Sequence, residues 1–181
     1  MNAAELICDF VNTRELLEET EELSSPESLA EWLVARDLAP RGVQATDADL
    51  RQAIELRDAL RQALLGHNGV VVDETAAFAT LDSAARQARI QLCFGQGAGE
   101  LTPETGGVTA SLGRIAIAVH SAMSDGSWAR LKACRASDCE WAFLDTAKNH
   151  SRAWCSMSSC GNREKARAFR ERHRHSSGSS K

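Results

Sequence analysis

Apolar residues recur at three- and four-residue steps through most of the chain, which predicts a domain built mainly from amphipathic helices. The first helix is expected over residues 1–17, with Leu6, Phe10 and Leu17 turned toward the core. The acidic run at residues 18–22 is expected to follow it as a solvated loop.

Capping signals place three more helices. Ser25 followed by Pro26 is typical of an N-cap and a first helical position. Thr46 and Asp73 are N-cap candidates for a long central helix and for an alanine-rich helix. A further stripe of apolar residues over 108–123 predicts a fifth helix before a boundary near residue 126.

The hydrophobic period changes near residues 89–103. Ile90, Leu92 and Phe94 alternate with less apolar neighbours, and the glycine-rich segment 95–99 follows them. This pattern predicts one β-hairpin, because a period of two is typical of a strand and glycine of its turn. The glycines are not expected to bind phosphate, since no βαβ helix begins there.

Length and composition allow two units. A chain of 181 residues with 43% hydrophobic residues can fill one helical core and carry a small module. We expect an acidic helical domain over 1–126, a metal-binding module over 127–175 and a disordered polar tail over 176–181. Neither a basic leader nor a long apolar stretch is present, so the cytoplasm is the expected location.

Charge is distributed unevenly along the chain. Residues 1–127 hold 9 Lys and Arg against 20 Asp and Glu, a net charge of −11, whereas residues 128–181 hold 12 against 5, a net charge of +7. The basic part is expected to meet a polyanion such as nucleic acid. The alternative is that the two parts neutralise each other across an internal interface.

Four of the six cysteines form two pairs, with four residues inside each pair and fifteen between the pairs. This spacing is typical of two loops that hold one structural zinc ion in a tetrahedron of thiolates, which leaves no open position for hydrolysis. The alternatives are disulfides or free thiols, or His150 in place of one sulfur. The predicted ligands are Cys134, Cys139, Cys155 and Cys160. The other two, Cys8 and Cys93, are expected to be buried, inert thiols.

A module of about fifty residues needs both apolar side chains and a metal to fold. The expected core residues of this module are Trp128, Leu131, Trp141, Phe143 and Trp154. Asp145 is expected to orient Arg152 or a backbone turn rather than to act as a base.

The segment after Cys160 holds strong helix formers and no helix breaker, which predicts one helix anchored at the zinc. Its arginines fall at steps of four, three and four residues, so they share one face and suit insertion into a DNA groove. The alternative is a solvated face paired with Glu164 and Glu171. The predicted nucleic-acid contacts are Asn149, Arg152, Asn162, Arg163, Lys165, Arg167, Arg170 and Arg174.

Two strings around the second cysteine pair, Trp154–Met157 and Cys160–Arg163, resemble the CGNR zinc finger. The F-x-D-x-S-x-N-x-x-R pattern of that family is matched at Phe143, Asp145, Asn149 and Arg152. Ala147 departs from the pattern, because the family usually has serine at this position.

Residues 9–13, Asp-Phe-Val-Asn-Thr, resemble the opening of the ABATE domain, a helical domain usually found ahead of a CGNR finger. The expected fold is therefore mainly α, with an N-terminal helical domain that holds one β-hairpin. A small treble-clef-like or ribbon-like zinc module ending in a basic helix is expected to follow. The resemblance implies a bacterial, stress-related regulator that requires zinc and binds DNA.

The leading hypothesis is a transcription regulator that binds double-stranded DNA through its zinc module, while the acidic domain senses a signal, takes a small ligand or forms a homodimer. The alternative is a zinc-stabilised module that binds protein or RNA. An enzyme is not expected, since no nucleophile with its base, open metal position or cofactor loop supports one. No catalytic residue and no membrane partner is predicted.

Overall fold

A computed structural model gives the structure of the protein and describes residues 1–95 and 98–177. The helices of this part are α1 (Ala3–Val11), α2 (Pro26–Ala35), α3 (Asp47–His67), α4 (Glu74–Gln87), α5 (Gly107–Ser124) and α6 (Asn162–Ser177). The strands form three antiparallel pairs, β1 (Arg14–Glu15) with β2 (Thr20–Glu21), β3 (Ile90–Phe94) with β4 (Gly99–Pro103), and β5 (Leu131–Ala133) with β6 (Ala142–Leu144). Two short helical turns are η1 (Trp128–Arg130) and η2 (Met157–Gly161). The predicted class, mainly α with a cysteine-rich module that ends in a helix, is confirmed.

Side-chain caps begin three helices where the sequence predicts them. Ser25, Thr46 and Asp73 each accept a hydrogen bond from the backbone N–H three residues later. These bonds satisfy N–H groups that the first helical turn leaves without partners. The starts of α2, α3 and α4 are therefore fixed locally.

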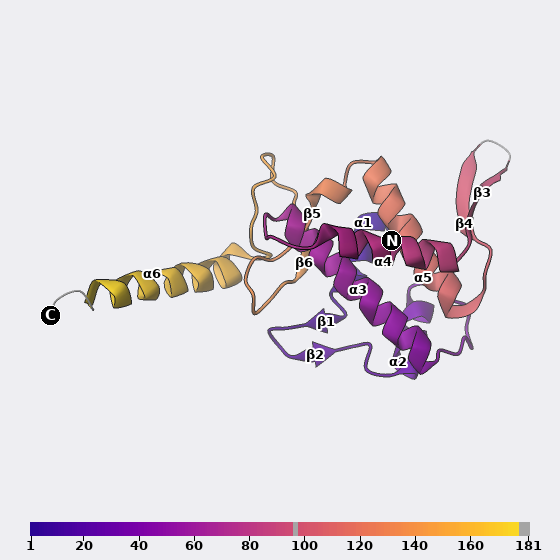
Figure 1. Ribbon diagram of the computed structural model, residues 1–181, viewed down its shortest axis with the longest axis horizontal. Coiled ribbons are helices and arrows are strands. Elements are labelled where there is room, and N and C mark those ends of the chain that lie inside the picture. Colours follow the sequence, from indigo (N-terminus) through magenta and orange to yellow (C-terminus); the bar gives the residue numbers. More distant parts are fainter. Residues whose placement is uncertain (96–97, 178–181) are drawn as a thin grey trace.

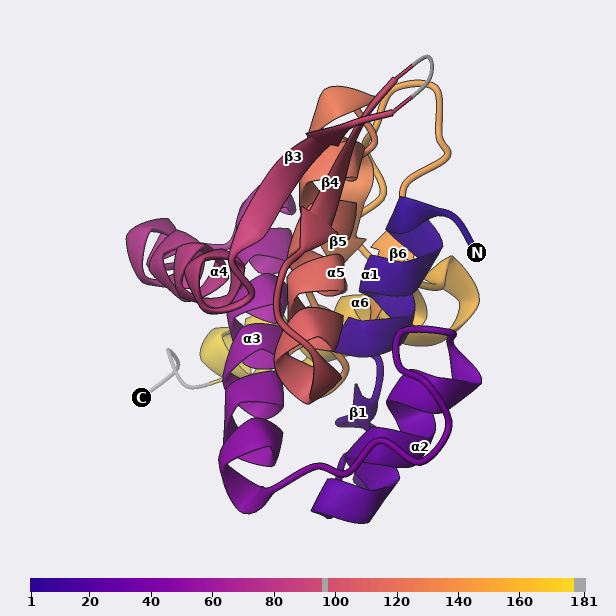
Figure 2. The same cartoon turned by 90° about the vertical axis from the view of Figure 1, so that its right-hand side faces the viewer.

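Helix α3 is central to the body and contacts α1, α2, α4 and α5 (Figures 1 and 2). Its buried side chains Leu56, Leu60 and Leu64 belong to one hydrophobic cluster with residues of all four of these helices. Full burial of one such leucine contributes about 1.5–3 kcal/mol. The broad apolar stripe predicted for this segment thus makes α3 the core helix.

The first helix is shorter than the sequence predicts, because α1 ends at Val11. Asn12 leaves the helical path and bonds the backbone of Ala142: its Nδ2 donates to the carbonyl at 3.0 Å, and its Oδ1 accepts from the N–H at 2.7 Å. The chain then turns into β1 and β2. Leu17, predicted to face the core, is 41% exposed as a result.

The acidic run at residues 18–22 is only partly a loop, since it contains strand β2. Two buried arginines of α3 hold the β1–β2 pair in place. Arg57 is 1% exposed, and its Nη1 donates to both carboxylate oxygens of Glu21 at 2.7 and 2.8 Å. The Nη2 of Arg61 donates to the backbone carbonyl of Arg14 at 3.1 Å. A buried guanidinium requires such partners. The two arginines therefore stabilise the β1–β2 pair rather than a continuation of α1.

The predicted β-hairpin is present as β3 and β4, and it projects from the body (Figure 1). Residues 96–97 of its predicted glycine-rich turn lie outside the described residues. Leu92 and Phe94 are 54% and 82% exposed. Cys93 is exposed between them, so the prediction of a buried thiol at this position is wrong.

The predicted module at residues 127–175, called the finger from here on, shares part of its hydrophobic core with the helical domain. Trp128, Leu131 and Ala133 belong to the same buried cluster as the helices, and β5 contacts α3. A second, smaller cluster surrounds the cysteines and includes Phe143, with Trp141 partly buried against it. The hydrophobic core therefore continues past residue 126.

Helix α6 extends away from the rest of the molecule (Figure 1). It continues through Ser177, whereas residues 178–181 of the predicted tail lie outside the described residues. None of the helices in the described part of the chain combines the length and the apolar character that crossing a bilayer requires.

Candidate metal centre and basic helix

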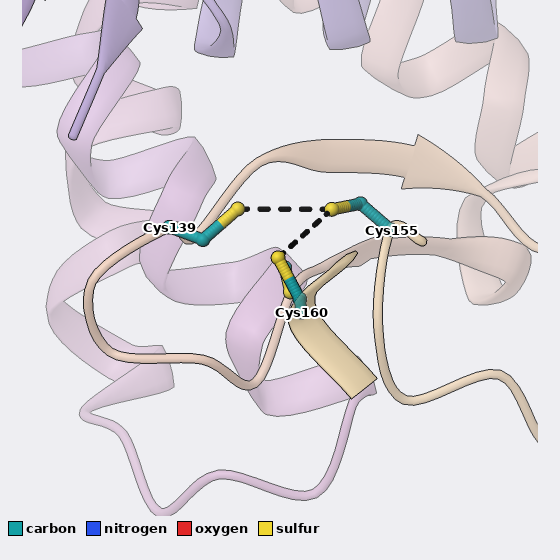
Figure 3. A group of neighbouring side chains, drawn as sticks. Cys139, Cys155 and Cys160 are labelled. Atoms are coloured by element: carbon teal, nitrogen blue, oxygen red, sulfur yellow. Dashed lines mark hydrogen bonds between the residues drawn. The ribbon is translucent and has the colours of Figure 1, made fainter. Parts of the chain in front are cut away.

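The four cysteines of the two predicted pairs converge on one point. Figure 3 shows three of them, Cys139, Cys155 and Cys160. The four Sγ atoms all lie within 4.8 Å of one another, and the Sγ of Cys155 is 3.7 Å from that of Cys139 and 3.6 Å from that of Cys160. Zinc–sulfur bonds of about 2.3 Å in a tetrahedron place sulfurs about 3.8 Å apart, so this set fits one zinc ion. The four thiols are free and much farther apart than the roughly 2.05 Å of a disulfide bond, which contradicts the disulfide alternative.

Local backbone bonds position each ligand. Cys134 directly follows β5, and its N–H donates to the carbonyl of Trp141 at 2.9 Å. Cys139 lies in the turn before β6, while Cys155 lies in the loop after it. Cys160 belongs to η2, a single π-helical turn that leads into α6. A bound zinc ion would therefore crosslink the β5–β6 turn to the start of the basic helix.

His150 is not part of this group. Its side chain is exposed, and its backbone carbonyl accepts a hydrogen bond from the ammonium group of Lys132. Four sulfurs complete the shell of a structural zinc ion and leave no position for a substrate or a reactive water.

The pKa values of the cysteine thiols are shifted in different directions. A hydrogen bond from the thiol of Cys139 outweighs burial and lowers the pKa of Cys134 to about 5. Burial and a hydrogen bond with Cys160 raise the pKa of Cys155 to about 12. The bond to Cys134, together with burial, raises the pKa of Cys139. In this arrangement one thiolate accepts hydrogen bonds from protonated thiols. A divalent cation would replace those bonds, because it allows every ligand to ionise.

Arg163 links the second cysteine pair to the first. Its Nη2 lies 3.4 Å from the Sγ of Cys160 and 3.1 Å from Oδ1 of Asp138, which precedes Cys139. Burial lowers the pKa of Arg163, but the charges of Cys160 and Asp138 outweigh this effect and raise the pKa above its ordinary value. The guanidinium thus supports a sulfur ligand, as groups around a metal site commonly do.

The two residues between Cys160 and Arg163 have structural roles as well. A Cβ atom at Gly161 would collide with the sulfur of Met157 and approach the ring of Trp154, so glycine allows close packing here. The Nδ2 of Asn162 donates to the carbonyl of Ser158 at 3.3 Å and closes the turn before α6. All four residues of the CGNR string therefore contribute to the metal-binding turn.

Asp145 fixes the loop between β6 and Cys155, as the sequence predicts. Its Oδ2 lies 2.8 Å from the Nζ of Lys132 and accepts from the N–H of Arg152 at 3.0 Å, while its Oδ1 accepts from the N–H of Ala147 at 3.0 Å. Burial raises the pKa of Asp145, but these donors outweigh it and hold the pKa below its ordinary value. Ala147 therefore keeps a backbone role at the position where serine was expected.

Arg152 is engaged within the finger. Its guanidinium lies 4.8 Å from the centre of the Phe143 ring, and its Nη2 donates to the carbonyl of Cys155 at 2.7 Å. It therefore braces the loop that carries a zinc ligand. Asn149 is exposed, and its Oδ1 accepts from the hydroxyl of Ser151 at 2.8 Å.

The arginines of the predicted row on α6 have different surroundings. Arg167 resembles Arg163, because its Nη2 lies 3.2 Å from Oδ2 of Asp138 and its Nη1 lies 2.6 Å from Glu164. The ion pairs of Lys132, Arg163 and Arg167 all lie within the finger. These three cations are therefore neutralised by carboxylates of the finger and not by the acidic domain.

Other cations of α6 face solvent. Lys165, Arg170 and Arg172 are exposed and make no ion pair with any described residue. Arg174 lies one helical turn beyond Arg170, and its side chain lies outside the described residues. The helix therefore presents unpaired positive charge on the part that extends from the body.

Two asparagines with no predicted role in the site hold the finger on the helical domain. Asn12 and Asn68 are the C-cap residues of α1 and α3. Asn12 pairs with the backbone of Ala142, and the Nδ2 of Asn68 donates to the carbonyls of Ala133 and Ala153 at 2.7 and 2.8 Å. Asn12 lies in the string that resembles the ABATE opening, and Asn68 follows a predicted helix, but neither signal indicates a distant partner.

Comparison with family models gives two matches. Residues 130–173 match the CGNR zinc finger, and residues 4–126 match ABATE, described as "Putative stress-induced transcription regulator". The chain matches none of the curated proteins with which it was compared. The chain therefore belongs to the ABATE family and carries a CGNR zinc finger whose four cysteines form the site for one structural zinc ion.

Proposed function

We propose that this protein is a cytoplasmic, zinc-dependent bacterial transcription regulator that binds duplex DNA through α6, with the ABATE domain receiving a stress signal or forming a homodimer. The observation that carries the proposal is the extension of a cationic helix from the metal site, away from the acidic domain. The family description supports a role in transcription. No catalytic step is part of the proposal, because the four-sulfur site has no open coordination position.

The charge of α6 supports a polyanionic partner. The helix holds six Lys and Arg against two Glu, which gives a net charge of +4. Its 16 residues span about 24 Å at 1.5 Å per residue, and the major groove of B-DNA admits an α-helix. Phosphate contacts by exposed cations provide affinity, whereas base contacts provide specificity.

The contacts of the arginines divide them into two roles in this proposal. Arg163 and Arg167 hold the helix to Asp138 and so set its direction relative to the zinc site. Lys165, Arg170 and Arg172 are exposed cations that would contact DNA phosphates. Arg174 stays a predicted contact on the same face.

Titration of a mixed-sequence duplex against salt tests this function. The zinc-loaded protein is expected to bind with an affinity that falls steeply and linearly on a log–log plot of salt concentration, as counterions are released. The triple variant Lys165→Ala/Arg170→Ala/Arg172→Ala is expected to weaken binding to every sequence. Each lost phosphate contact should reduce the salt slope by about 1.

Arg51→Ala is the matched control, because Arg51 is an exposed cation on α3 of the acidic domain. It should leave both affinity and salt slope unchanged, and all variants should keep their zinc. Negligible duplex binding at low salt would overturn the proposal. Tighter binding of structured RNA than of duplex DNA at equal salt would replace it with the RNA-binding alternative.

A further inference from the structure

A small hollow of about 40 Å³ is lined by residues of α3, α4 and α5 in the ABATE domain. Its apolar lining consists of Leu56 from α3, Leu112 from α5 and Ala84 from α4. Leu56 and Leu112 are 1% and 4% exposed, so they belong to the core and form the floor. The hollow is remote in sequence from the cysteines and from α6.

Small side chains on α4 leave this space open. Thr80, Ser83 and Ala84 line the hollow, and all three have small side chains. Nearby, a Cβ atom at Gly113 of α5 would collide with Ala88, so α4 and α5 approach closely at one end. The hollow therefore lies beside short side chains of α4, whereas α4 and α5 pack closely at one end.

The rim of the hollow offers hydrogen-bond acceptors. The hydroxyl of Thr80 donates to the carbonyl of Ala76 at 3.2 Å, which leaves its lone pairs toward other donors. The Oγ of Ser83 accepts from the Nε2 of Gln87 at 3.1 Å, so the carbonyl oxygen of that amide stays available. The rim thus offers several oxygen acceptors, beside the amide of Gln52 and the hydroxyl of Thr109.

Glu55 gives the rim its charge. Its side chain is exposed at the edge of the hollow and makes no ion pair with any described residue. None of the residues that line the hollow is basic. A carboxylate without a cationic partner, beside hydroxyl oxygens and an apolar floor, matches a ligand with a positive head and a short hydrocarbon body.

We infer that this hollow binds a small organic cation, a primary ammonium on a short aliphatic chain. The three N–H donors of the ammonium would meet the carboxylate of Glu55 and the oxygens of Thr80 and Gln87. The aliphatic chain would cover Leu56 and Leu112. A carboxylate ligand is excluded by repulsion from Glu55, and a neutral alcohol would lose the charge-assisted bond.

The test uses three probes with the same four-carbon chain, namely n-butylammonium, n-butanol and butyrate. Each is titrated into the zinc-loaded full-length protein while the methyl NMR signals of Leu56 and Leu112 are followed. We expect saturable shifts with n-butylammonium, about tenfold weaker binding of n-butanol and no saturation with butyrate.

Glu55→Gln should weaken n-butylammonium about tenfold and leave n-butanol unchanged, because the substitution removes the charge and retains the shape. Glu18→Gln, an exposed glutamate beyond the hollow, should leave all three titrations unchanged. Equal affinities for n-butylammonium and n-butanol, or a Glu55→Gln protein that binds n-butylammonium like the wild type, would overturn the inference. DNA is absent from these titrations, so their outcome is independent of the proposed function of α6.

Discussion

The ammonium group of Lys132 lies 2.8 Å from Oδ2 of Asp145, and the two side chains are only 7% and 0% exposed. Lys132 belongs to β5, next to the first cysteine pair, whereas Asp145 follows β6. The Nζ of Lys132 also contacts the backbone carbonyls of His150 and Arg152. One buried ion pair thus fixes the loop that leads to Cys155.

Asp145→Asn is expected to lower the free energy of unfolding of the zinc-saturated protein by about 3–5 kcal/mol, because it leaves the buried ammonium of Lys132 without its counter-charge. Urea denaturation with excess zinc measures the change. Asp82→Asn is the control, since the ion pair of Asp82 with Arg86 spans 3.8 Å and both side chains are over 70% exposed. Its effect should stay within about 1 kcal/mol. Equal effects of the two substitutions would contradict the importance of the buried pair.

The effect of Asp145→Asn on the unfolding free energy should not change with pH near neutrality. The folded-state pKa of Asp145 lies below its ordinary value of about 3.9, so its charge contributes stability above that ordinary value. This contribution is lost only as the pH falls through the folded-state pKa. The difference in unfolding free energy between wild type and Asp145→Asn should therefore stay constant between about pH 8 and pH 6. A difference that narrows within this range would argue for a raised pKa.

Removing zinc is expected to unfold the cysteine loops and leave the five helices of the ABATE domain folded, because most of the residues in the main hydrophobic cluster belong to those helices. Hydrogen exchange before and after chelation should show loss of protection around Cys134 and Cys155, with protection retained in α3 and α5. Simultaneous loss of protection throughout the chain would show that the ABATE domain also depends on the metal.

Thiol counting provides an independent readout of the same site. In the zinc-loaded protein only the exposed Cys93 should react readily with a thiol reagent near pH 8, because burial and the charge of Asp9 raise the pKa of Cys8 to about 12. Chelation should expose four further thiols. Cys93→Ser should retain one zinc per chain, whereas Cys160→Ser should lose it.

Arg163→Ala is expected to weaken zinc binding about 10- to 100-fold, since it removes the guanidinium that contacts Cys160 and Asp138. Competition with a chromophoric chelator measures the affinity. Arg170→Ala provides the comparison, because Arg170 is an exposed arginine on the same helix without a contact to the cysteines. If both variants lose zinc equally, the helix as a whole and not the guanidinium supports the site.

Asn68→Ala is expected to destabilise the attachment of the finger by about 1–3 kcal/mol, because two backbone carbonyls lose their donor. Faster exchange of the β5 amides in the zinc-loaded protein would report this change. Asn149→Ala removes an exposed asparagine of the finger and should leave these rates unchanged. Unaltered exchange in Asn68→Ala would show that apolar contacts of β5 suffice.

Local signals in the sequence predicted several features of the fold. Ser25, Thr46 and Asp73 begin helices because a capping bond joins residues three positions apart. The alternation around Leu92 predicted a hairpin for the same reason, since strand pairing there joins neighbouring segments. Both kinds of signal are complete within a few residues.

The contacts of the charged residues were not predictable in this way. The sequence predicted that Arg163 and Arg167 contact nucleic acid. In the structure both guanidinium groups bond Asp138, which lies 25 residues before Arg163 and 29 before Arg167. The exposure of Cys93 similarly follows from the projection of a whole hairpin and not from its neighbours.

By itself, the sequence determined the helices, the hairpin and the set of four metal-binding sulfurs, because capping, periodicity and ligand spacing act over short separations. Tertiary structure decided where α1 ends and which cations stay free. Asn12, at the end of α1, hydrogen-bonds the backbone of Ala142, 130 residues later, and Arg57 forms an ion pair with Glu21. Such bonds form only once α3 and the finger are in place, and no local pattern encodes them.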